Sequence, residues 1–179
     1  MITISLAEIR AKSPCAVGWR KVLAAKGPDM EALFPLTDLI ETNDFDDASW
    51  AMRCRPEYNN LWRKYAVWCA RQVEHLMTDD RSVAALDVAW RHSDGLATDE
   101  ELAAAWATAW DAAWDAAGDA ASGTARSAAR ATAWDAAWDA AWGASSAAGG
   151  ATGWPPGRDA ASAAQKQKLI EILNAGEWV

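Results

Sequence analysis

Short helical patterns of apolar and polar residues fill the first part of the chain, and each ends at a recognisable signal. Ser5 and Glu8 have the spacing of a capping box, in which each side chain bonds the other residue's backbone N–H. Ser13 followed by Pro14 predicts an N-cap and the first residue of the next helix, and Gly27 predicts where that helix ends. β-Branched residues are sparse and never alternate, so the pattern predicts no strand.

Further helical patterns follow, and the strongest of them covers 56–78. The segments 35–41 and 45–54 have helical spacing with acidic first turns. In 56–78 the apolar residues lie within one broad stripe, which predicts the central helix of the domain. These residues are Leu61, Tyr65, Trp68, Val73, Leu76 and Met77. The pattern of 80–92 predicts one more helix, closed by Gly95.

The composition changes after residue 97, where a repeat of four residues begins. Thr98 and Glu101 form a second capping box, which opens the repeat. Every fourth residue then belongs to one series: Trp106, Trp110, Trp114, Gly118, Ser122, Arg126, Arg130, Trp134, Trp138, Trp142, Ser146, Gly150 and Trp154. Alanine provides 24 of the 51 residues in 103–153, which favours a helix. Because the phase survives the central interruption, we predict one tandem array.

The step of four residues limits how this array can pack. Four residues turn a helix by about 400°, so each Trp lies about 40° beyond the previous one. Three successive Trp form one apolar stripe, whereas the whole array would spread over more than a full turn. We therefore expect the chain to reverse near 118–123 and to pack the first three Trp against Trp134, Trp138 and Trp142. A helix that wraps its partners with a right-handed twist and a β-solenoid with four-residue sides are the alternatives.

The end of the chain reads as a further helix. In 158–176, Leu169, Ile172 and Leu173 are the apolar positions, and Gly176 predicts the stop. The predicted fold class is therefore all-α. We expect an N-terminal multi-helix domain over 1–97, the tetrad repeat over 98–157 and a C-terminal helix over 158–179 that packs back.

The charge and the composition argue against some classes of partner and some cellular compartments. The net charge of −8 and a pI near 4.7 argue against direct nucleic-acid binding, which normally needs a basic face. No apolar run approaches 18 residues, so we expect no membrane span, and the N-terminus lacks the pattern of a signal peptide. Three cysteines without CxxC spacing are typical of a reducing compartment, so the expected localisation is cytoplasmic.

No segment has the pattern of a catalytic, metal or cofactor site. His75 and His92 are the only histidines, and no second Cys/His pair accompanies them to form a zinc site. Glu74 beside His75 and Asp87 with His92 could form acid–base pairs, but a solvated helix surface explains them better. Glycine-rich phosphate loops are also missing from the sequence. We therefore predict no enzyme activity, no metal and no cofactor. Arg126 and Arg130 occupy Trp positions of the series, where they either stack on indole or bind an anionic ligand or partner.

An aspartate follows many of the Trp residues. These aspartates are Asp111, Asp115, Asp119, Asp135 and Asp139. One interpretation is that their charge keeps a Trp-rich repeat in solution. The other is a rail of carboxylates about 6 Å apart that imitates the phosphates of a nucleic-acid strand.

Three segments resemble a known family. They are "SPCAVGWRKVLAAKG" at 13–27, "YAVWCARQVEHLMTDDRSVAALDVAWRHSDGLATDEELAAA" at 65–105, and "AWDAAWDAAW" at 133–142. With them the chain resembles a family of prophages and bacterial genomes whose members are identified as immunity proteins of polymorphic toxin systems. The resemblance implies a non-enzymatic protein that binds and neutralises another protein. Members of the family often place Arg where this chain has Trp in the tetrads.

We thus expect a binding protein that occupies the surface of another protein, either a toxin or a host defence component. A receptor for a nucleotide-like small molecule, an acidic nucleic-acid mimic and a helical spacer are the alternatives, and a homo-oligomer stays open. The candidate binding residues all belong to the repeat. They are Trp106, Trp110, Trp114, Arg126, Arg130, Trp134, Trp138, Trp142, Asp111, Asp115, Asp135 and Asp139.

Overall fold

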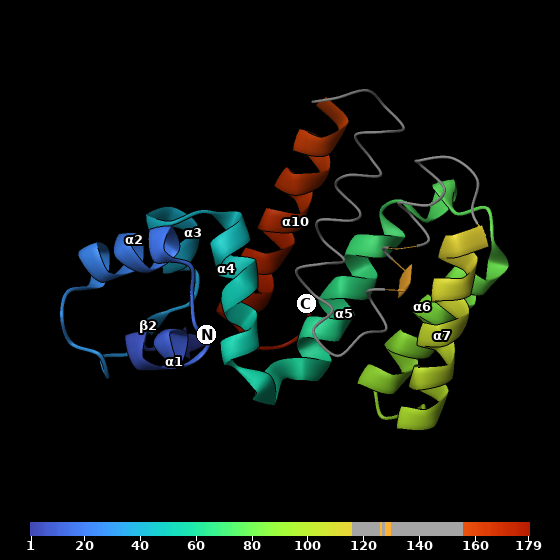
Figure 1. Ribbon diagram of the computed structural model, residues 1–179, viewed down its shortest axis with the longest axis horizontal. Coiled ribbons are helices and arrows are strands. Elements are labelled where there is room, and N and C mark those ends of the chain that lie inside the picture. Colours follow the sequence, from blue (N-terminus) through green and yellow to red (C-terminus); the bar gives the residue numbers. More distant parts are fainter. Residues whose placement is uncertain (116–125, 127, 130–155) are drawn as a thin grey trace. The chain divides into compact units, whose positions relative to one another are not determined.

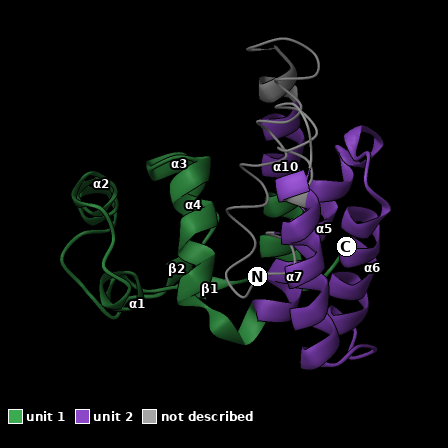
Figure 2. Ribbon diagram, turned by 45° about the vertical axis from the view of Figure 1, so that its right-hand side comes forward, with its two compact units in different colours: residues 1–58, 168–179 green, residues 59–167 purple. Residues whose placement is uncertain are grey.

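A computed structural model describes residues 1–115, 126, 128–129 and 156–179 (Figure 1). Helices dominate this described part, so the predicted all-α class is confirmed. The chain forms two compact units, Met1–Tyr58 with Lys168–Val179, and Asn59–Gln167 (Figure 2). The ranges 1–97, 98–157 and 158–179 divide the chain differently and stay a prediction. Among the described helices, none is long and apolar enough to cross a membrane.

The first unit contains a very small sheet that the sequence did not predict. Strand β1 (Thr3–Ile4) pairs antiparallel with β2 (Phe34–Pro35), and Ile4 lies opposite Phe34. Strands of two residues leave no alternating pattern to detect. The backbone N–H of Ile2 donates to the carbonyl of Leu173 at 2.8 Å, and Leu36 N–H donates to the Ile2 carbonyl at 3.0 Å. The beginning of the chain is therefore held by residues near its other end.

Short helices make up the rest of this unit. They are α1 (Leu6–Ala11), α2 (Ala16–Lys26), α3 (Asp38–Thr42) and α4 (Phe45–Ala51), followed by 3-10 turns at Met52–Cys54 and Pro56–Tyr58. The capping box before α1 is confirmed, since Ser5 N–H donates to Glu8 Oε2 at 2.7 Å and Glu8 N–H donates to Ser5 Oγ at 3.3 Å. Gly27, with a φ of 78°, ends α2 as predicted.

The predicted start of α2 is wrong by two residues. Ser13 has a φ of 55°, and its N–H donates to the Arg10 carbonyl at 3.1 Å, so it finishes the preceding helix. An N-cap needs an extended backbone, which Cys15 adopts with a φ of −63° and a ψ of 150°. Its Sγ accepts the Gly18 N–H at 3.2 Å. A cysteine therefore takes the capping position that we assigned to a serine.

The second unit consists of longer helices. They are α5 (Asn59–Arg71), a 3-10 turn at Glu74–Leu76, α6 (Asp80–Ser93), α7 (Asp99–Asp115) and the first part of α10 (Pro156–Ala175). The capping box before α7 is confirmed, because Thr98 N–H donates to Glu101 Oε2 at 2.7 Å and Glu101 N–H donates to Thr98 Oγ1 at 3.2 Å. Gly95 and Gly176, with φ values of 72° and 82°, follow α6 and α10 as predicted.

The single helix predicted over 56–78 is shorter than expected. It ends at Arg71, where Val73 N–H bonds the carbonyl three residues back, and Val73 has left helical geometry with a φ of −117°. Val73 remains buried, with an exposed fraction of 2%. The apolar stripe thus continues through a turn rather than along one helix. The predicted core positions Leu61 and Tyr65 are buried, and so are Leu169, Ile172 and Leu173 in α10.

Candidate functional site

Helix α7 carries the first three Trp of the tetrad series, and it packs beside α6 in both Figures 1 and 2. The contact consists of small side chains. Ala85 of α6 forms one buried cluster with Ala105, Ala109 and Ala129, and Val88 packs against it. We call these four alanines the alanine seam. Small side chains allow two helices to approach closely, so the seam fixes which side of α7 faces inward.

Two of the three indoles of α7 are exposed. Trp114 has an exposed fraction of 81% and Trp106 one of 44%, whereas Ala109 is fully buried. Trp110 is half-buried and packs against the alanine seam. The expectation that a helical hairpin buries all three indoles is therefore wrong for Trp106 and Trp114. The hairpin itself falls largely outside the described residues and stays a prediction.

Helical geometry explains this reversal. The buried residues of α7 are Leu102, Ala105, Ala109 and Ala112, at alternating steps of three and four. Such steps keep a stripe on one side of a helix, whereas steps of exactly four drift by about 40°. Trp114 consequently lies about 160° around the helix from the centre of the buried stripe. Alanine is so frequent here that it supplies most of the buried stripe, with Leu102 at one end and Trp110 beside it.

Trp110 sits between the two exposed indoles and contacts one of them. Its ring meets that of Trp106 edge to face, with centroids 6.3 Å apart and planes at 69°. Its Nε1 is buried and finds no acceptor among the residues that the structure describes. The described aspartates of the repeat, Asp111 and Asp115, therefore do not accept the N–H of Trp110.

The two described aspartates of the repeat differ in their surroundings. Asp115 Oδ2 accepts from Arg81 Nη2 at 2.8 Å, and the same guanidinium bonds Asp79 at 2.6 Å. The hydrogen bond to Asp79 is the largest cause of a raised Arg81 pKa, and the bond from Arg81 lowers the Asp79 pKa. Asp111 is exposed and has no ion-pair partner within the described part of the chain. Its carboxylate is therefore accessible next to the indoles.

The other candidate residues of the repeat are placed only in part. Arg126 is exposed and helical. Arg130, Trp134, Trp138, Trp142, Asp135 and Asp139 lie outside the described residues. The structure therefore brings together Trp106, Trp110, Trp114 and Asp111 on one helix, and joins Asp115 to α6 through Arg81.

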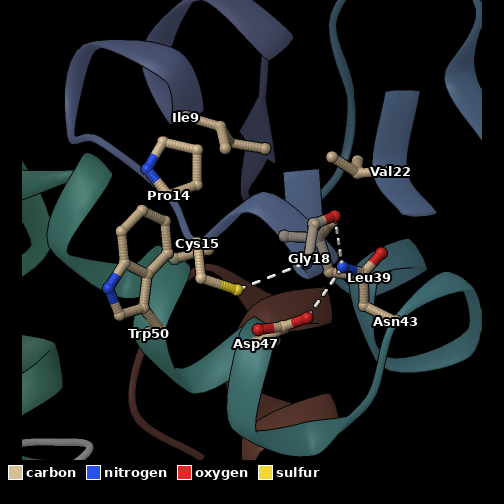
Figure 3. Close-up of a pocket in the computed structure, with 10 residues that line it drawn as sticks. Ile9, Pro14, Cys15, Gly18, Val22, Leu39, Asn43, Asp47 and Trp50 are labelled. Atoms are coloured by element: carbon tan, nitrogen blue, oxygen red, sulfur yellow. Dashed lines mark hydrogen bonds between the residues drawn. The ribbon is translucent and has the colours of Figure 1, made fainter. Parts of the chain in front are cut away.

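A pocket in the first unit was not predicted from the sequence (Figure 3). Its lining comes from α1 to α4 and their connections: Ile9, Pro14, Cys15, Gly18, Val22, Leu39, Asn43, Asp47, Trp50 and Ala51. About 60 Å³ of it is open to a water-sized molecule. That is roughly the volume of two water molecules in the liquid, and ligand sites usually offer about 300 Å³ or more. A nucleotide does not fit.

The polar groups of this pocket bind one another. Asn43 Nδ2 donates to the Gly18 carbonyl at 2.9 Å and to Asp47 Oδ2 at 2.8 Å, as Figure 3 shows. Cys15 Sγ already accepts the Gly18 N–H. The pairing of Gly18 with Asn43 spans 25 residues, so no local pattern reveals it. These hydrogen bonds connect α2 to Asn43, which lies between α3 and α4, and Asn43 to Asp47 of α4.

Gly18→Ala is expected to destabilise the first unit by about 1–3 kcal/mol. A Cβ at this position would stand 2.8 Å from Asp47 Oδ2, and Asn43 holds that carboxylate in place. In an Asp47→Ala background the same substitution should instead stabilise by about 0.5–1 kcal/mol, because alanine is the better helix former. Chemical denaturation of the four proteins in this cycle measures both effects. Equal effects in the two backgrounds would contradict the close approach.

Two cysteines and one histidine of the described residues have defined surroundings. Burial raises the pKa of the Cys54 thiol to about 11 and that of Cys69 further still, so both stay protonated at neutral pH. His92 Nε2 lies 2.8 Å from Asp99 Oδ1 and links the end of α6 to the start of α7. Over 1–115 and the other described positions, no group of three His, Cys, Asp or Glu side chains could hold a metal ion.

Comparison with known proteins adds no relative. No protein-family model, no curated protein and no solved structure matches this chain.

Proposed function

We propose that this chain is a non-enzymatic binding protein, of the immunity or anti-defence type, that acts by occupying the surface of another protein. The observation that carries the proposal is the outward orientation of α7. Trp114 is 81% exposed and Trp106 is 44% exposed, while alanines make the contact with α6. We call Trp106, Trp114 and Asp111 the α7 indole face.

Large exposed aromatic side chains on a folded helix favour a role in recognition. Monomeric proteins rarely leave large neighbouring apolar groups in water, and such groups often mark an interaction site. Tryptophan is also the residue type most enriched among the side chains that dominate binding energy. A helix that presents residues at steps of four can lay them in a groove of a partner protein. In the α7 indole face, Trp106 and Trp114 lie two such steps apart and both are exposed.

A small-molecule receptor receives less support. The pocket lined by Asn43 and Asp47 has room for about two water molecules, and its polar groups are already paired. A wider hollow of about 390 Å³ beside Arg10, Trp19 and Leu23 contains none of the Trp or Arg residues of the repeat. The exposed indoles lie along a convex helix, whereas small ligands bind in concave sites. The exposed indoles of α7 therefore suit the recognition of a protein surface better than the binding of a small molecule.

Site-specific photocrosslinking tests the proposal. A photoreactive phenylalanine analogue replaces Trp114 in one variant and Lys166, an exposed residue of α10, in the control. Both are expressed in cells of the organism that carries the gene. We expect one defined protein adduct from position 114, no such adduct from position 166, and loss of the adduct when Trp106→Ala is added.

Other outcomes would count against this function. Equal adducts from both positions would show non-specific adhesion of the surface. A nucleic-acid adduct at position 114, or none at all, would remove the α7 indole face as a protein-binding site. Circular dichroism of each variant establishes that the fold is unchanged.

A further inference from the structure

We infer that the partner surface bound by the α7 indole face presents arginine side chains, which stack on Trp106 and Trp114 and pair with Asp111. This inference rests on the proposed function and names the chemistry of its partner. Three observations support it: cations of the same chain lie over other indoles, α7 is acidic, and arginine can stack on a ring while it pairs with a carboxylate.

Several half-buried indoles of this protein are covered by cations from the same chain. Arg53 Cζ lies 5.3 Å from the ring centroid of Trp50. Lys64 Nζ and Arg71 Cζ lie 5.4 and 5.9 Å from the ring of Trp90. Lys168 Nζ lies 5.0 Å from that of Trp178. These distances are within the range in which a cation is attracted to the face of an indole.

The exposed indoles of α7 differ in this respect. Helix α7 contains no Lys or Arg, and within the described ranges no cation lies over Trp106 or Trp114. Arg81, which reaches the end of α7, is already bound by Asp79 and Asp115 at 2.6 and 2.8 Å. The ring faces are thus open to a cation from another molecule.

The charge on α7 favours such a cation. Asp111 is exposed and lies three residues before Trp114, so the two side chains are neighbours on the helix surface. The first turn of α7 adds Asp99, Glu100 and Glu101, and the whole chain has a net charge of −8. A second copy of this chain would place acidic surface against acidic surface, and phosphate groups would be repelled. A basic protein surface is the complementary occupant.

Arginine fits this combination better than lysine. Its planar guanidinium stacks on an aromatic face and still directs N–H groups at a carboxylate in its own plane. The ammonium group of lysine attracts the ring as a point charge and is more strongly hydrated. An indole with a carboxylate one helical turn away therefore discriminates between the two cations.

The test uses a soluble, alanine-based helical peptide with arginine at every fourth position as the probe. Matched peptides replace each arginine with lysine or with uncharged citrulline. Titration is followed by Trp fluorescence and by calorimetry at low and high salt. We expect the arginine peptide to bind about tenfold more tightly than the lysine peptide, and the citrulline peptide to bind most weakly.

Variants of the protein test whether the arginine peptide binds at the α7 indole face. Trp114→Ala is expected to lower the affinity for the arginine peptide about tenfold, and Trp114→Phe should lower it less. Asp111→Asn should weaken binding at low salt and have little effect at high salt, because salt screens exposed charges. The control Lys166→Ala should leave the affinity unchanged.

The outcomes separate this inference from the proposed function. Equal affinity for arginine and lysine peptides, or no binding of either, would overturn the inference. If the crosslinked adduct at position 114 still forms in that case, the proposed function stands and the partner uses apolar contacts instead. If the arginine peptide binds the α7 indole face but no protein adduct forms in cells, the chemistry is right and the proposed function fails.

Discussion

Ile172→Ala is expected to lower the free energy of unfolding by about 2–5 kcal/mol, the largest effect of any single change proposed for this chain. Ile172 of α10 is fully buried, together with Leu169 and Leu173. The carbonyl of Leu173 also accepts the backbone N–H of Ile2. A cavity at position 172 therefore opens next to the residue that binds the backbone of Ile2.

Urea denaturation followed by far-UV circular dichroism measures this loss. The matched control is Asn174→Ala, two residues further along the same helix and exposed, which should change stability by less than about 0.5 kcal/mol. If the two variants shift the transition equally, the contact between α10 and the first residues of the chain does not contribute as the structure indicates.

Ala109→Leu is expected to cost about 1–3 kcal/mol, although leucine is a good helix former and more apolar than alanine. Ala109 has no exposed surface and lies in the alanine seam, where Ala85 of α6 leaves no room for three more carbon atoms. Either the helices move apart or the new side chain takes a strained rotamer. Both outcomes remove contacts along the whole seam.

Two neighbouring changes act as controls for the orientation of α7. Ala107 is exposed, so Ala107→Leu should alter stability by less than about 0.5 kcal/mol. Trp114 lies on the side opposite the seam, so Trp114→Ala should change stability by a similarly small amount in spite of the size of the indole. Chemical denaturation of the three variants settles the direction of the helix. A large loss for Trp114→Ala with none for Ala109→Leu would mean that the indoles, not the alanines, face inward.

Features that depend on a few adjacent residues were predictable. The capping boxes at Ser5 and Thr98 formed as expected, since each bond joins groups three residues apart. The glycine stops behaved in the same way, because a positive φ is a local requirement. Ser13 was misassigned for a related reason, since a serine before a proline suits either the end of one helix or the start of the next, and packing decides.

Features that depend on distant partners were not predictable. The tetrad pattern identified α7 as unusual, but the side it turns inward packs against Ala85 and Val88 of α6, which periodicity within α7 does not encode. The pocket around Asn43 joins residues 25 positions apart. In each case the local sequence permits more than one conformation. The contact with a segment that is distant in the sequence determines which of them forms.

The backbone bond between Ile2 and Leu173 has a consequence for the order of events during synthesis. The first 58 residues leave the ribosome without Leu169, Ile172 and Leu173, because all of 59–167 must be translated before those side chains exist. At about 5–20 residues per second, this delay lasts several seconds or more. Ile2 lacks its hydrogen-bond partner in α10 throughout that time. The unit that contains the N-terminus is therefore the later of the two to be completed on the ribosome, and a nascent chain interrupted within 59–167 leaves it open to chaperones and proteases.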